Sequence, residues 1–143
     1  QVVDREAVSM GISECSTTDD IVSDIMGRWA AAFSRLDAGA LASLYSRNAF
    51  FFGSNPNLYR GHDGVTAYFS ALPKWSSPSV QFTEVRTAPA ADGVINVAGT
   101  ATFVVDARPE PLLVKITWVI VAEDGDWKIA SHHVSSKTPL IET

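Results

Sequence analysis

Apolar residues recur at every fourth position near the start of the chain and predict a long amphipathic helix. Its apolar face follows a polar stretch at 17–20 and consists of Ile21, Ile25, Trp29 and Phe33. The hydroxyl and acidic side chains of that stretch suit a helix start, because they accept hydrogen bonds from free backbone N–H groups. We expect the helix to end at 37–39 and to be followed by a short second helix that carries Tyr45.

The second half of the chain has a different pattern, because apolar and polar residues alternate there as they do in β-strands. Four long strands are predicted, at 79–87, 94–105, 112–122 and 127–136. Two short strands, at 49–52 and 58–60, and a third helix from Gly61 to Pro73 precede them. Three helices followed by a four-stranded meander predict an α+β domain, with a strongly coiled sheet around the first helix.

The last predicted strand, 127–136, gives the clearest indication of a site. Strict alternation places Trp127 and Ile129 on the same face as His133 and Ser135, so this face changes from apolar to polar along the strand. Such a face is expected to run from a core into a cavity, with His133 as a neutral hydrogen-bond partner or as an acid/base group. His132 would then lie on the surface or in an interface. One extra residue in the strand would reverse the assignment and turn His132 inward.

Length and charge limit the classes of function. The 143 residues suit one domain at 19–137, with an N-terminal arm at 1–18 and a C-terminal tail at 138–143. A net charge of −5 without a basic run argues against nucleic acid and against membrane surfaces. The lone Cys15 excludes an intrachain disulfide and favours a cytoplasmic protein, although an export signal removed before Gln1 would leave the same sequence.

Several short segments together have the order and spacing of a known family, although none is specific alone. They are Trp29–Phe33, Leu36–Gly39, Leu44–Tyr45, Ala49–Gly53, Tyr59–Gly61, Val65, Tyr68–Phe69, Gly99–Phe103 and Trp127–Ser136. In these the chain resembles the SnoaL-like group of the nuclear transport factor 2-like superfamily. It is most similar to bacterial relatives of the calcium/calmodulin-dependent protein kinase II association domain.

The resemblance implies a cone-shaped α+β fold, in which three N-terminal helices pack on a strongly curved, mostly antiparallel sheet around an apolar pocket. It also implies homodimers through the outer sheet face. The pattern of the strand at 112–122 also favours a dimer. Val119 and Val121 alternate with Trp118 and Ile120, so both faces of the strand are apolar and the outer face needs a partner to cover it. The resemblance implies no single activity, since the fold hosts isomerases, dehydratases, epoxide hydrolases, cyclases and non-catalytic binders.

A pocket in this chain is expected to be rich in aromatic residues. Its candidate ligand-binding residues are Trp29, Phe33, Tyr45, Phe52, Tyr59, Tyr68 and Trp118, with His133 and Ser135 as polar members. Simple core packing also explains Phe33 and Trp118. We expect no metal site and no cofactor, because nitrogen and sulfur ligands are scarce.

Three hypotheses about function follow. The first is a small-molecule binding domain whose ligand is unidentified. The second is an enzyme of the cyclase, dehydratase or isomerase type with His133 as its acid/base. The third is a non-catalytic association domain. An acid beside His133 would favour the enzyme, and a fully packed interior would favour association.

Overall fold

The structure, a computed structural model, describes residues 17–106 and 108–142. Three helices precede the long strands, as predicted: α1 (Thr18–Ser34), α2 (Ala38–Ala42) and α3 (Gly61–Ser70). The Thr17 hydroxyl caps α1 by accepting a hydrogen bond from the Asp20 N–H, and the Asp20 carboxylate accepts one from the Thr17 N–H. Most of the predicted N-terminal arm, including Cys15, lies outside the described residues.

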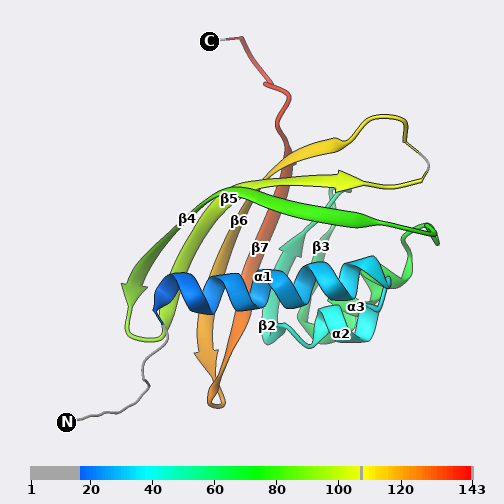
Figure 1. Cartoon of the computed structure of the whole chain (residues 1–143). Coiled ribbons are helices and arrows are strands. Elements are labelled where there is room, and N and C mark those ends of the chain that lie inside the picture. The colour runs from blue at the N-terminus through cyan, green and yellow to red at the C-terminus, as the bar shows by residue number, and fades with distance from the viewer. Residues whose placement is uncertain (1–16, 107, 143) are drawn as a thin grey trace.

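Six strands form one sheet in the order β3-β2-β7-β6-β5-β4. The strands are β2 (Tyr45–Phe52), β3 (Leu58–Arg60), β4 (Ser79–Ala91), β5 (Val94–Val104), β6 (Leu112–Glu123) and β7 (Asp126–Ser136). Only β2 and β7 pair in parallel, and the other neighbours are antiparallel. The sheet curves around the helices (Figure 1). The predicted α+β cone is therefore confirmed.

The helix α1 lies across the hollow side of the sheet, in front of β4 to β7 (Figure 1). Its buried face includes Trp29 and Phe33, whose rings stack with centroids 5.4 Å apart. Tyr45 departs from the prediction: it begins β2 and does not belong to the second helix. The short helix α2 ends at Ala42, and β2, which begins at Tyr45, pairs with β7.

The strand β7 contains a β-bulge that reverses its alternation. Val119 of β6 pairs with Ser131 and Ile120 pairs with Ile129, so Ala130 is an extra residue without a partner. Because of this extra residue, Ile129 and His132 both face inward, three positions apart. His133 is exposed on the outer face. The expectation that His133 faces the interior is therefore wrong, and the alternative with His132 inward is correct.

The outer face of the sheet carries exposed aromatic side chains on β2. Phe50 and Phe52 are 52% and 39% exposed, and the Phe52 ring lies 5.5 Å from the ring of His133. The three helices lie on the opposite side of the sheet (Figure 1). Among the residues that the structure describes, no helix is long and apolar enough to cross a membrane.

Candidate functional site

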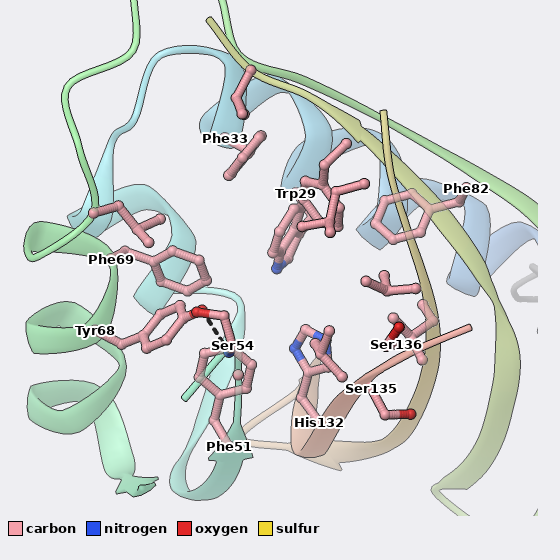
Figure 2. A pocket seen from close by; sticks show the side chains of 18 of the residues that line it. Trp29, Phe33, Phe51, Ser54, Tyr68, Phe69, Phe82, His132, Ser135 and Ser136 are labelled. Atoms are coloured by element: carbon pink, nitrogen blue, oxygen red, sulfur yellow. Dashed lines mark hydrogen bonds between the residues drawn. The ribbon is translucent and has the colours of Figure 1, made fainter. Parts of the chain in front are cut away.

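A cavity of about 300 Å³ lies between α1, α3 and the hollow face of the sheet. Its walls are mainly aromatic: α1 contributes Trp29 and Phe33, α3 contributes Tyr68 and Phe69, β2 contributes Phe51 and β4 contributes Phe82. These side chains surround an open space, and the ring of His132 points into that space from β7 (Figure 2). Ser135, Ser136 and Arg108 supply further polar groups to the lining.

Four of the nine predicted ligand-binding residues line this cavity, namely Trp29, Phe33, Tyr68 and Ser135. Tyr45 and Trp118 are fully buried behind the wall, and Tyr59 packs edge-on against Tyr68. The other two, Phe52 and His133, lie on the outer face of the sheet, so the structure contradicts their predicted place in the pocket.

His132 and Phe51 also line the cavity, and neither is among the nine candidates. His132 was foreseen only as the alternative that an extra residue in the strand would produce, and Phe51 was not foreseen. The same shift of one position explains both errors, because β2 and β7 are paired as Phe51 with His132 and Phe52 with His133. In the run Phe50–Phe52 the hydrophobicity is uniform, so only pairing shows which ring faces inward. No even spacing from Tyr45 could have found Phe51, because the pairing of β2 with β7 shifts register between Tyr45 and Phe50.

A buried chain of hydrogen bonds links α1, β2 and β7 at the cavity wall. The indole N–H of Trp29 donates to the hydroxyl oxygen of Tyr45 over 3.0 Å. The same hydroxyl lies 2.7 Å from Nδ1 of His132. All three side chains are buried, with Tyr45 0% exposed and His132 4% exposed. We call this chain the Trp29–Tyr45–His132 relay.

The surroundings of His132 keep its ring neutral. The ring centroid of Phe51 is 4.6 Å from that of His132, and those of Trp118, Tyr45 and Trp29 are 5.4, 6.0 and 6.2 Å away. Removal from water disfavours the charged imidazolium, so burial lowers the pKa of His132 to about 3, with a smaller effect from the neighbouring His133.

Tyr45 is neutral for the same reason. Burial raises the pKa of its hydroxyl far above the ordinary value, although the hydrogen bond from Trp29 acts in the opposite direction. The partner of His132 is therefore a protonated phenol. An acid–histidine pair, which would have favoured the enzyme hypothesis, is replaced here by a neutral one.

A second polar group of the wall lies where β2 ends. The hydroxyl of Tyr68 accepts a hydrogen bond from the Ser54 N–H over 2.9 Å and lies 2.7 Å from the Ser54 hydroxyl (Figure 2). Gly53 makes this approach possible, because a Cβ atom there would lie 2.5 Å from the Tyr68 ring. These bonds fix the Tyr68 ring as part of the wall.

The loops beside the cavity are held by the carboxylate of Asp106. It accepts hydrogen bonds from the N–H and hydroxyl of Ser76, both over 2.6 Å, and from the N–H of Ser77 over 3.3 Å. The bonds from Ser76 hold the pKa of Asp106 below its usual value. They tie the segment that carries Trp75 to the end of β5, where Val105 and Arg108 contribute to the cavity lining.

Comparison with known proteins identifies the family. The model of the SnoaL-like domain matches residues 22–139, and the chain belongs to this family. The predicted resemblance to the SnoaL-like group is thus confirmed. No curated protein is significantly similar to the sequence.

Solved structures show the same fold at low sequence identity. A proposed calcium/calmodulin-dependent protein kinase II association domain from Xanthomonas campestris is 19% identical and has a TM-score of 0.78, over 87% of this chain and 91% of that one. A proposed scytalone dehydratase from Novosphingobium aromaticivorans is 13% identical, with a TM-score of 0.74 over 86% and 87% of the two chains. A proposed dehydratase of the nuclear transport factor 2-like family from Streptomyces avermitilis is 17% identical, with a TM-score of 0.74 over 86% and 100%.

Proposed function

We propose that this domain binds a small, mainly apolar molecule in its aromatic cavity, with His132 as the polar anchor. The observation that carries the proposal is the open cavity with a neutral, hydrogen-bonded histidine in its wall. Ligand sites are usually concave and apolar, with a few fixed polar groups that orient the ligand. Here His132, the Tyr68–Ser54 pair and Ser136 have that role.

The size of the cavity indicates the size of the ligand. An engineered cavity of about 150 Å³ with an apolar lining accepts benzene. The cavity of this domain, at about 300 Å³, is twice as large. A ligand of two or three fused rings would fill it, and its faces would stack on or meet the edges of the aromatic side chains.

The electrostatics of His132 support binding over acid/base catalysis. A histidine with a pKa of about 3 is neutral at physiological pH and cannot act there as a general acid. As a base it is weak, because efficient general bases have a pKa near the working pH. The enzyme hypothesis with this histidine would need a substrate that raises its pKa. A fully packed interior would have favoured pure association, and the domain has an open cavity instead.

The test uses fluorene, an apolar probe with three fused rings, and follows the fluorescence of the tryptophans that line the cavity. Saturable binding by the wild type is expected. Leu72→Trp should abolish it by filling the cavity, whereas Leu58→Trp, on the exposed edge strand β3, should bind normally. Circular dichroism of each variant shows that it is folded. Absence of saturable binding to the folded wild type, or equal binding by Leu72→Trp, would contradict the proposal.

A further inference from the structure

We propose that Trp29 and Tyr45 lock His132 into the tautomer that presents an Nε2–H donor to the cavity, so that the site selects ligands with a hydrogen-bond acceptor such as a ring carbonyl. This inference rests on the proposed binding function and specifies the chemistry of the ligand. Neither Trp29 Nε1 nor the Tyr45 hydroxyl needs to touch the ligand. Both would act as positioning groups.

The direction of the first hydrogen bond follows from the chemistry of indole. The Trp29 Nε1–H group can only donate, so the Tyr45 oxygen accepts at this contact. The hydroxyl of Tyr45 has one proton of its own. Nδ1 of His132, 2.7 Å away, is the one further hydrogen-bond partner of this hydroxyl among the described residues.

The direction of the second hydrogen bond follows by counting protons. If Nδ1 of His132 carried the ring proton, it would also donate to the Tyr45 oxygen, and the Tyr45 proton would have no acceptor in a site that is 0% exposed. If Nδ1 is unprotonated, Tyr45 donates to it and every polar group of the relay is satisfied. The neutral ring then carries its proton on Nε2.

The consequence for ligands concerns the free side of the His132 ring. Within the part of the chain that the structure describes, Nε2 has no hydrogen-bond partner, and the ring belongs to the cavity lining (Figure 2). A ligand oxygen that accepts a hydrogen bond fits this position. A ligand N–H group would meet another N–H group and lose its own hydrogen bonds to water, so the site should reject it.

The first test measures the tautomer directly, in the unliganded wild type. Long-range ¹H–¹⁵N NMR spectra of the histidine rings distinguish protonated from unprotonated nitrogen. We expect protonated Nε2 and unprotonated Nδ1 at His132 at pH 7. A His132 ring protonated on Nδ1 would overturn the inference, whether or not any ligand binds.

The second test compares three probes of nearly equal shape. They are 9-fluorenone, which offers a carbonyl acceptor, fluorene, which offers neither donor nor acceptor, and carbazole, which offers an N–H donor. One hydrogen bond corresponds to about a five- to tenfold change in affinity. We therefore expect fluorenone to bind the wild type about five- to tenfold more tightly than fluorene, and carbazole to bind more weakly than fluorene.

Matched variants assign the preference to the relay. His132→Phe should bind fluorenone and fluorene equally, whereas His133→Phe, on the outer face, should keep the wild-type ratio. Tyr45→Phe frees the tautomer and should reduce the penalty for carbazole. If fluorene binds but fluorenone is no tighter, or carbazole is the tightest of the three, the acceptor preference is refuted while the binding function stands. If none of the probes binds, the binding function itself fails.

Discussion

The burial of His132 makes the stability of the domain depend on pH in a range where few other groups titrate. In the unfolded chain the ring has a pKa of about 6.5, whereas in the folded domain burial lowers it to about 3. Below pH 6.5 the unfolded chain therefore takes up a proton that the folded domain does not. The contribution of His132 to stability is fully present above this pH and is lost as the pH falls toward 3.

The magnitude follows from proton linkage. One proton taken up on unfolding changes the free energy of unfolding by about 1.4 kcal/mol per pH unit. Summed from pH 7 to pH 5, the titration of His132 lowers the free energy of unfolding by about 2 kcal/mol. Asp106 and Glu123 also have lowered pKa values in the folded state, but their losses occur mostly below pH 5, near the ordinary pKa of a carboxyl group.

The assay is urea unfolding followed by circular dichroism at pH 7, 6 and 5. The wild type should lose about 2 kcal/mol of unfolding free energy over this range, and the exposed-site variant His133→Phe should lose a similar amount. His132→Phe keeps a ring of similar size and removes the titrating group. It should be about 1–3 kcal/mol less stable at pH 7, because the Tyr45 proton loses its acceptor, but its stability should hardly change with pH.

Two outcomes would refute this reasoning. One is a wild-type stability that changes by less than about 0.5 kcal/mol between pH 7 and pH 5, a quarter of the linkage value. The other is an equal pH dependence in the wild type and in folded His132→Phe. If His132→Phe does not fold, NMR titration of the wild-type ring gives the answer, since a pKa near 6.5 would show that the ring is not desolvated.

Two further predictions concern the wall and the outer face. Gly53→Ala should destabilise the domain by about 1–3 kcal/mol, because its Cβ would displace the Tyr68 ring. Gly27→Ala, in open space on α1, should instead stabilise the domain by about 0.5–1 kcal/mol. Equal effects of the two substitutions in thermal unfolding would contradict this prediction. We also propose a homodimer through the outer sheet face, where Phe52 is exposed beside His133. Sedimentation should show a dimer for the wild type and for the tail variant Leu140→Lys and a monomer for Phe52→Lys, and a wild-type monomer at micromolar concentration would disprove it.

The sequence by itself determined the order of the elements and the fold class. The spacing of four from Ile21 to Phe33, the cap at Thr17 and the alternation in the second half are local properties, and each was enough to predict its element. Order and spacing also identified the family. Trp29, Phe33 and Tyr68 line one cavity, as large apolar groups on helix faces meet a common core.

Only the tertiary structure decided which histidine enters the cavity. Alternation along a strand has a period of two, so one extra residue sends every later side chain to the other face. Ala130 is that residue, and its bulge arises from the pairing of β7 with β6, which no local pattern in the sequence reports. The partner of His132 was equally hidden, because Tyr45 is 87 residues away and reaches Nδ1 only when β2 pairs with β7.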